Sequence, residues 1–213
     1  PPHPLPPARR SPNQPRHGPR HNYITDITVK VAFDNYAPYD IELEDGYSPS
    51  IYVFDFGGQD KFLFCCSQTG GSGGYGNYRV YHLTTDSYYL LYDDKSDSER
   101  STFGASFEQG GFMRLCNCDT QYTLDVYLGY MDETYYNLIF EPNGSVKSGE
   151  QPYVNAISFV APVLNSASGV WRLITYRSVA AIAEVNRLGY IVQTLDYDGE
   201  KFVPASTEFS IML

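Results

Sequence analysis

YTLDVYLGY (residues 122–130) and DITVKVAF (residues 26–33) decide the fold class, because an apolar or aromatic residue stands at every second position of each stretch. YTLDVYLGY places one set on a single face: Tyr122, Leu124, Val126, Leu128 and Tyr130. DITVKVAF does the same with its own set: Ile27, Val29, Val31 and Phe33. Successive side chains of a β-strand point to opposite faces, so a period of two predicts strands with one buried face.

Many further segments are rich in β-branched and aromatic residues and are typical of strands. They are IYVFDF (51–56), KFLFCC (61–66), NYRVYHL (77–83), SYYLLY (87–92), GFMRLC (111–116), YYNLIF (135–140), VNAISFV (154–160), GVWRLITY (169–176) and GYIVQTL (189–195). Turn sequences separate them, among them EDG (44–46), PNG (142–144) and YDGE (197–200). We therefore expect an all-β fold, a compact antiparallel β-sandwich or β-barrel with long loops.

One short helix is expected near residues 179–188. Ser178 can cap its start, an apolar stripe follows at Val179, Ile182 and Val185, and Gly189 can end it. A single short helix leaves the all-β class unchanged.

PPHPLPPARRSPNQPRHGPRH (residues 1–21) holds eight of the fourteen prolines and no acidic residue. Proline lacks the backbone donor and fixes the backbone near polyproline II, so this stretch predicts an extended linker. A single β-rich domain, residues 22–213, should follow it. The chain begins with Pro1 and ends in the alternating STEFSIML (206–213), from which we expect a fragment of a longer polypeptide.

The charge of the chain is uneven. The formal net charge is −10, but the linker holds four arginines, which leaves 11 basic and 25 acidic residues, or −14, on residues 22–213. So acidic a surface repels phosphate backbones and anionic lipids, which argues against nucleic-acid binding. The longest apolar runs have only strand length, so we expect no membrane insertion.

No catalytic, cofactor or metal-binding motif stands out. His82 is the only histidine of residues 22–213, and the glycine-rich GGSGGYGN (70–77) lacks the Lys-Ser/Thr of a phosphate-binding loop. YDDKSDSER (92–100) departs from a calcium loop at several ligand positions and is better interpreted as a solvated loop. We predict no enzymatic activity, no cofactor and no metal.

Four cysteines form two tight clusters, Cys65-Cys66 and Cys116-x-Cys118. Neither spacing matches a structural zinc site. Buried free thiols and disulfides between neighbouring strands both fit, and one cysteine of the second cluster can meet Cys65 or Cys66 if their strands pair.

The chain is unusually aromatic, with 20 tyrosines and 12 phenylalanines. In the strand-like pairs Tyr88-Tyr89 and Tyr135-Tyr136, one ring of each pair must leave a one-faced core. Exposed tyrosines serve interfaces and sugar-binding surfaces, because they offer rigid amphipathic area at low entropic cost. With the acidic residues near the first pair, the candidate ligand-binding residues are Tyr88, Tyr89, Asp93, Asp94, Tyr135 and Tyr136.

Together with the linker and the tyrosines, the texture of GVWRLITYRS (169–178) and LGYIVQTLDYDG (188–199) resembles the projection (spike) domain of an astrovirus capsid protein, of the avian type. The resemblance is one of overall character, without a short diagnostic motif. It implies a homodimeric spike on the virion surface, without enzymatic activity. Its role would be attachment to a host receptor, glycan or protein, and recognition by antibodies.

The same resemblance implies a protease-accessible linker that joins the domain to the rest of the capsid. Arg9, Arg10, Arg16 and Arg20 stand in the linker, and none precedes proline, so they are candidate processing sites. Two other hypotheses remain open. One is a lectin-like or structural β-domain of a cellular or phage adhesin, and the other is a β-fold hydrolase that uses paired carboxylates.

Overall fold

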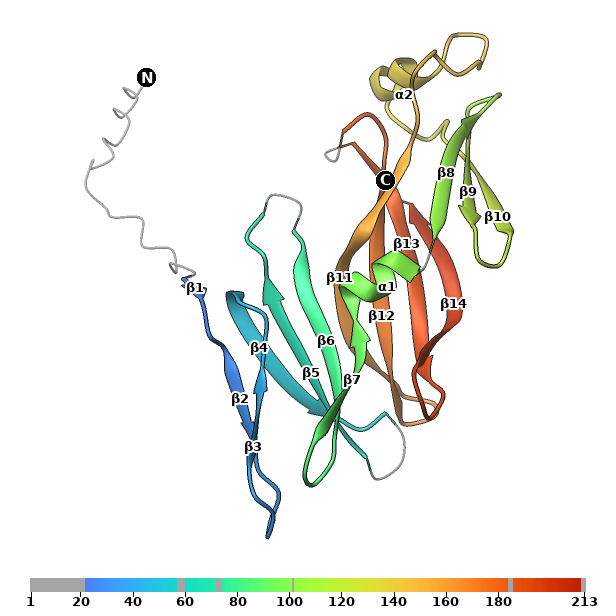
Figure 1. The fold of residues 1–213 in the computed structure, drawn as a ribbon. Coiled ribbons are helices and arrows are strands. Elements are labelled where there is room, and N and C mark those ends of the chain that lie inside the picture. The colour runs from blue at the N-terminus through green and yellow to red at the C-terminus, as the bar shows by residue number, and fades with distance from the viewer. Residues whose placement is uncertain (1–21, 57–59, 72–73, 101, 184–185, 212–213) are drawn as a thin grey trace, which may run out of the picture.

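The computed structural model describes residues 22–56, 60–71, 74–100, 102–183 and 186–211. Within these residues the chain forms antiparallel sheets and two short helices (Figure 1). The all-β class and the antiparallel sandwich are confirmed. The linker prediction and the four candidate processing arginines lie outside the described residues.

Two larger sheets carry most of the structure. The five-stranded sheet contains, in spatial order, β1 (Tyr23–Ile24), β4 (Gly46–Phe54), β5 (Lys61–Gln68), β6 (Gly76–Leu83) and β7 (Tyr88–Asp93). The four-stranded sheet is a meander of β11 (Tyr153–Asn165), β12 (Val170–Ala180), β13 (Arg187–Tyr197) and β14 (Phe202–Ile211).

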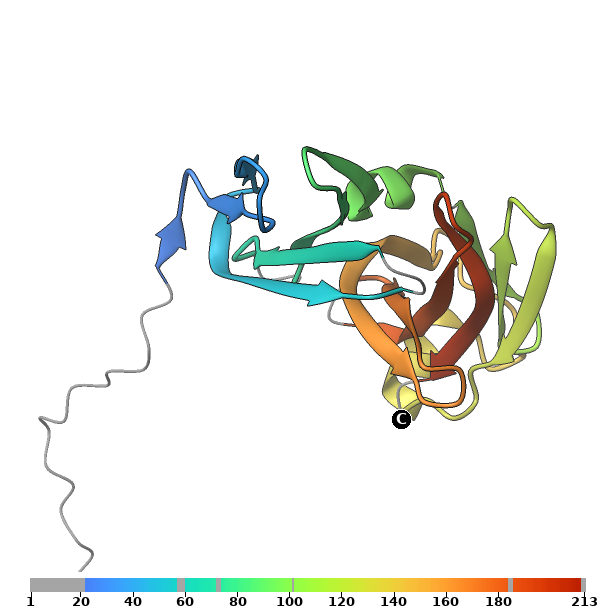
Figure 2. The same cartoon turned by 90° about the horizontal axis from the view of Figure 1, so that it is seen from below.

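Smaller elements flank the two sheets. The three-stranded sheet consists of β8 (Phe103–Glu108), β9 (Phe112–Asn117) and β10 (Tyr122–Tyr127). A two-stranded hairpin consists of β2 (Thr28–Val31) and β3 (Tyr39–Glu42). The helices are α1 (Asp94–Arg100) and α2 (Glu133–Ile139). Figure 2 shows the four-stranded sheet between the five-stranded and the three-stranded sheets.

The apolar run KFLFCC forms β5, which is buried on both faces. Phe62 and Phe64 point into a core shared with the four-stranded sheet, and Leu63 and Cys65 point into a core beneath the β2–β3 hairpin. A strand with two covered faces is expected to be apolar without alternation. This explains why the segment carries no period of two.

The four-stranded sheet buries one face, called here the inner face, against two different partners. Leu173 and Leu195, which pair across β12 and β13, pack against the five-stranded sheet. At the other end of the same strands, Val179 and Ile191 pack against the three-stranded sheet and α2. The sheet is therefore the common support of both neighbouring sheets.

Polar side chains occupy the middle of the inner face, where Thr175, Arg177 and Gln193 are buried. Arg177 donates hydrogen bonds to the carbonyl oxygens of Asp97 (3.1 Å) and Ser98 (3.4 Å), in the last turn of α1. A cation at this end satisfies carbonyl groups that lack a partner within the helix. Arg177 thus holds α1 against the sheet.

The prediction of a helix near residues 179–188 is wrong. Ser178, Val179 and Ala180 continue β12, and Gly189 lies within β13. A β-carbon on Gly189 would lie 2.4 Å from the Ser210 carbonyl oxygen. The glycine therefore lets β14 lie close to β13, and it does not end a helix. Of the i, i+3 apolar stripe, Val179 lies in β12 and Ile182 in the bend after it, and Val185 lies outside the described residues.

Both helices form where other structure was expected. The solvated loop predicted for residues 92–100 contains α1, and the strand predicted for residues 135–140 is mostly α2. In α2, the Asp132 carboxylate accepts a hydrogen bond from the Thr134 backbone N–H at 2.8 Å and caps the helix. This cap overrides the β-propensity of the two tyrosines that follow.

We predict that Leu173→Ala lowers the free energy of unfolding by about 2–5 kcal/mol, because it opens a cavity between the two larger sheets. Leu164→Ala removes the same atoms from β11 at a side chain that is 48% exposed and should cost less than about 1 kcal/mol. Urea denaturation of both variants measures the two values. Equal losses would contradict the assignment of Leu173 to the shared core.

Candidate functional site

An open cavity of about 560 Å³ lies where the five-stranded sheet meets the other face of the four-stranded sheet, called here the outer face. Its walls come from β5, β6, β11, β12 and β13. We call this cavity the aromatic cleft, because four rings line it: Tyr78, Phe159, Tyr176 and Tyr190. Its size lies within the range of small-molecule sites in proteins, roughly 300–1,000 Å³.

The four rings form a continuous series of contacts. The ring centroids of Tyr78 and Phe159 are 6.1 Å apart, those of Phe159 and Tyr176 5.7 Å, and those of Tyr176 and Tyr190 6.2 Å. The first and last pairs are edge-to-face, an arrangement that adds roughly 0.5–1.5 kcal/mol per pair beyond simple burial. The rings are thus held in place before any ligand arrives.

Strand register explains why three of the rings share one face. Phe159 of β11 pairs with Tyr176 of β12, and Tyr190 of β13 pairs with Ser178, two residues farther along β12. Side chains two apart on one strand lie on the same face. The outer face therefore carries Phe159, Tyr176 and Tyr190 side by side, and the Phe159 ring is 47% exposed.

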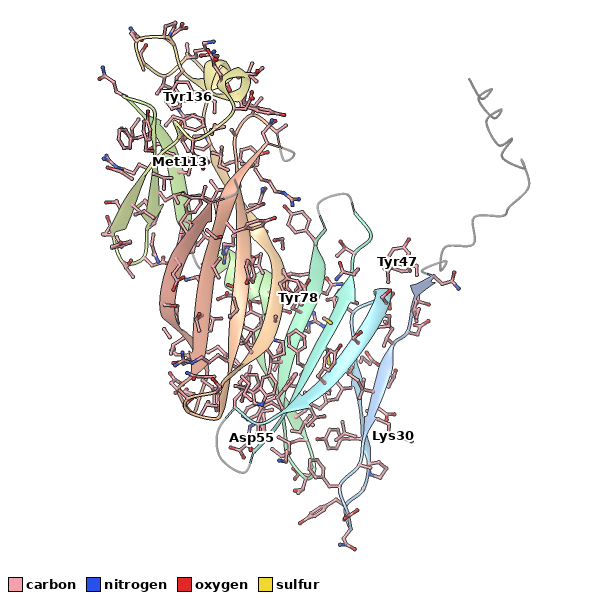
Figure 3. All side chains as sticks on the ribbon, turned by 180° about the vertical axis from the view of Figure 1, so that it is seen from behind. Lys30, Tyr47, Asp55, Tyr78, Met113 and Tyr136 are labelled. Carbon is pink, nitrogen blue, oxygen red and sulfur yellow. The ribbon has the colours of Figure 1, made fainter. Side chains whose placement is uncertain are left out.

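Tyr78 of β6 contributes the fourth ring from the opposite sheet. Figure 3 shows it between the two larger sheets, where its hydroxyl donates to the Ser158 carbonyl oxygen at 3.4 Å. Gly76 makes room for it, since a β-carbon there would lie 2.7 Å from the Tyr78 ring. Burial raises the pKa of Tyr78, so the hydroxyl stays protonated as a donor.

Polar groups stand beside the rings. Arg187, exposed at the start of β13, donates a hydrogen bond from Nη1 to the Tyr190 hydroxyl at 3.1 Å. Gln68 and Ser158 also line the cleft. Among the described residues that line it there is no carboxylate. The site can therefore stack a flat ligand and bond its polar groups, and it holds no acid and base pair.

The tyrosines predicted from the sequence lie elsewhere and do not come together. Tyr88 and Tyr89 are exposed on β7, and Tyr135 and Tyr136 lie on α2 at the other end of the molecule (Figure 1). The Tyr136 ring packs on Phe140 at 4.8 Å, at the edge of the core beneath α2. A role of these four tyrosines in ligand binding stays a prediction.

The predicted acidic pair has structural partners. Asp93 accepts hydrogen bonds from Arg79 Nε at 2.9 Å and from the Ser96 N–H at 3.0 Å, at the start of α1. Asp94, only 5% exposed, accepts a bond of 2.7 Å from the Tyr78 backbone N–H. Burial raises the pKa of Asp94 to about 6, and the neighbouring Asp93 carboxylate adds to the shift. Both carboxylates therefore tie α1 to β6.

The two cysteine clusters lie on different sheets. Cys65 and Cys66 are in β5, which pairs with β4 and β6, and Cys116 is in β9, which pairs with β8 and β10. The strand pairing needed for a disulfide between the clusters is therefore absent from the described sheets. All four thiols, including that of Cys118, are free in this structure.

Neither a metal cluster nor a membrane-spanning helix is found in the described part of the chain. The described residues contain no cluster of three or more His, Cys, Asp or Glu side chains that could hold a metal ion. Neither α1 nor α2, the helices found among those residues, is long and apolar enough to cross a membrane. A second open cavity, of about 610 Å³, lies beside Glu42, Asp45 and Arg79, and it has a polar lining. The aromatic cleft differs from it by its four rings.

Sequence reasoning missed Phe159, Tyr176, Tyr190 and Arg187. A signal was present, because YRS (176–178) and GYI (189–191) each place a tyrosine on the same face of two neighbouring strands, two residues apart in register. The sequence of each strand, however, did not say which of its two faces would be buried. That choice depends on the packing of the inner face.

Fold and cleft together define an all-β domain with an open, ring-lined cleft. Residues 102–210 match the family model described as YybI C-terminal domain, which covers half of the chain, so the chain belongs to this family. The matched segment contains Phe159, Tyr176, Arg187 and Tyr190, whereas Tyr78 precedes it.

A curated relative agrees with the family match. The chain is 24% identical over 160 residues to the protein named "Uncharacterized protein YybI" of Bacillus subtilis (strain 168). The alignment covers 74% of this chain and 61% of the relative, so the chain spans about three fifths of the relative's length. No solved structure matches the chain.

These comparisons correct the viral interpretation. The family and the relative are those of a bacterial protein, so the description of the chain as a viral protein, a capsid spike and part of a virion is wrong. The expected localisation on a virion surface is wrong for the same reason. The general texture of a tyrosine-rich β-domain does not distinguish the two origins.

We predict that Asp94 makes stability depend on pH. Its pKa of about 6 in the folded state exceeds the ordinary 3.8, so its contribution is largest below about pH 4 and is lost as the pH rises through about 6. Relative to Asp94→Asn, the wild type should lose about 2 kcal/mol of unfolding free energy between about pH 4 and pH 7. Denaturant titrations at a series of pH values measure this difference.

Asp93→Asn is the matched control for this experiment. Burial alone would raise the pKa of Asp93, but the hydrogen bonds from Ser96 and Arg79 outweigh burial and lower it. Relative to Asp93→Asn, the wild type should therefore gain stability as the pH rises through the acidic range. Differences of the same sign for both variants would contradict the placement of the two carboxylates.

We predict that Cys65 resists alkylation in the folded protein. Burial, together with the neighbouring Cys66 thiol, raises the pKa of Cys65 to about 12, and the thiolate is the reactive form. Iodoacetamide labelling near pH 7.5, followed by peptide mapping, should modify the half-buried Cys66, Cys116 and Cys118 first. In urea all four should react, whereas early modification of Cys65 would show that the core beneath the β2–β3 hairpin is open.

Proposed function

We propose that this domain is a non-enzymatic saccharide-binding module and that its ligand docks in the aromatic cleft. The observation that carries the proposal is the series of four rings in contact along an open cavity of about 560 Å³. Pyranose rings have an apolar C–H face that stacks on an aromatic ring, and hydroxyl groups at their edge that need hydrogen-bonding partners. The cleft offers both kinds of surface.

On the two central strands of the cleft, recognition has to use side chains. On the outer face, β12 and β13 are central strands, and both are hydrogen-bonded to a neighbour on each side. Their backbone groups are thus occupied and cannot pair with an added peptide strand. Stacking on Tyr176 and Tyr190, with bonds to their hydroxyls, favours a sugar over an extended peptide.

The same residues argue for binding without hydrolysis. Glycosidases use two carboxyl groups, roughly 5–9.5 Å apart, on either side of the scissile bond. The described residues that line the cleft include no carboxyl group. Asp94, whose pKa is raised, is buried and accepts a hydrogen bond from the Tyr78 backbone N–H. A lectin-like role therefore fits these residues better than a carboxylate hydrolase.

Binding to an array of oligosaccharides, followed by titration of the strongest ligand, tests the proposal. Tyr176→Ala should weaken binding at least about 10-fold, which corresponds to roughly 1.4 kcal/mol, because it removes the central ring of the series. Tyr176→Phe keeps the ring and should retain most of the affinity. Melting temperatures of both variants would show that the fold is retained.

Two exposed tyrosines provide matched controls. Tyr122→Ala on β10 removes a ring that is 63% exposed and far from the cleft, and it should leave binding unchanged. Tyr89→Ala tests the residues predicted from the sequence and should also have no effect. The proposed site would be refuted if no saccharide bound. It would also be refuted if Tyr89→Ala weakened saccharide binding and Tyr176→Ala did not.

A further inference from the structure

Arg187 stands apart from the other arginines whose side chains the structure describes. Arg79 pairs with Glu44 and Asp93, Arg114 with Asp125, and Arg172 with Asp196. Arg177 is buried and donates to the carbonyl groups of α1. Each of these guanidinium groups already serves the fold.

Arg187 has no carboxylate within ion-pair distance among the described residues. Among the described residues, its hydrogen bond joins Nη1 to the hydroxyl of Tyr190, itself one of the four rings of the cleft. This bond holds the guanidinium at the cleft, and no carboxylate of the described residues compensates its charge. Residues 22–213 carry a formal charge of −14, so carboxylates are plentiful elsewhere on the domain.

The position of this charge points to the ligand. Arg187, Tyr190 and Tyr176 line the same cavity, so a group bound by the guanidinium belongs to a ligand that also contacts the rings. A guanidinium presents donors in a planar fork that matches a carboxylate with two parallel hydrogen bonds. Arg187 is the only cationic side chain in the described lining, which matches one anionic group and disfavours a densely sulfated chain near so acidic a domain.

We propose that the aromatic cleft binds an acidic saccharide of the uronic-acid class. Arg187 binds the sugar carboxylate, and the rings of Tyr176 and Tyr190 take the apolar face of the same or the next sugar. This inference rests on the proposed saccharide-binding function and adds the charge of the ligand to it.

An array that pairs each acidic oligosaccharide with its carboxyl-reduced counterpart tests this inference. It should hold oligomers of galacturonate, glucuronate and mannuronate beside neutral and sulfated oligosaccharides, and the strongest pair is then titrated by calorimetry. The wild type should prefer the acidic member at least about 10-fold at low salt, and the preference should shrink as salt screens the charge. Arg187→Gln should remove the preference, and Arg187→Lys should keep part of it, because lysine retains the charge but not the fork.

Arg114→Gln is the matched control, since it removes the same charge from the three-stranded sheet. It should leave the preference for the acidic member unchanged. Equal loss in Arg114→Gln and Arg187→Gln would overturn the role of Arg187, because a general charge effect would explain both.

The remaining outcomes separate the two proposals. If the wild type binds acidic and reduced members equally and Arg187→Gln changes neither, the acidic ligand is refuted while saccharide binding stands. If the wild type binds neither member of any pair on the array, and no neutral sugar either, both proposals fail. Stronger binding of sulfated oligosaccharides than of uronic acids would refute the ligand class.

Discussion

The inner face of the four-stranded sheet is the constraint on which the rest of the structure depends. Along β12 and β13 it is apolar at both ends, at Leu173 and at Val179, and polar between them. The two ends need two separate apolar partners, which the five-stranded and the three-stranded sheets supply. Arg177 closes the polar middle by holding the end of α1.

This packing also determines where a ligand can bind. Because the inner face is covered, the outer face stays open, and strand register places Phe159, Tyr176 and Tyr190 together on it. Contact with the five-stranded sheet then brings Tyr78 beside them. The cleft is therefore a product of the contact between two sheets, and the segment matched by the family supplies only one of its walls.

The fold could be predicted from the sequence where local pattern and tertiary packing agree. The apolar run KFLFCC forms a strand that is buried on both faces, as such a run predicts. YTLDVYLGY forms a strand only over Tyr122–Tyr127, and of the face expected to be buried Tyr122 and Leu124 are exposed while Val126 is buried. Residues 178–189 misled prediction, because an apolar stripe over so short a segment fits a strand end followed by a turn as well as a helix. At Tyr135 and Tyr136 the cap at Asp132 outweighed the propensity of the aromatic residues.

The site was less predictable, because its residues come from five strands in two sheets. The sequence drew attention to tyrosine, but the exposure of a ring depends on which face of its sheet is covered, and this is a tertiary property. Arg187 carries no local signal, since its lack of a carboxylate partner among the described residues becomes visible only once the partners of the other arginines are known.

Nuclear magnetic resonance of protein labelled with ¹³C in the tyrosine rings tests the central claim most directly, that sugar rings stack in the aromatic cleft. The labelled protein is titrated with the uronic-acid oligosaccharide that binds most strongly. The account predicts saturable shifts of the ring signals of Tyr176 and Tyr190, with those of Tyr89 and Tyr122 unmoved. Shifts confined to Tyr89 or Tyr122, with Tyr176 and Tyr190 unchanged at saturation, would contradict it.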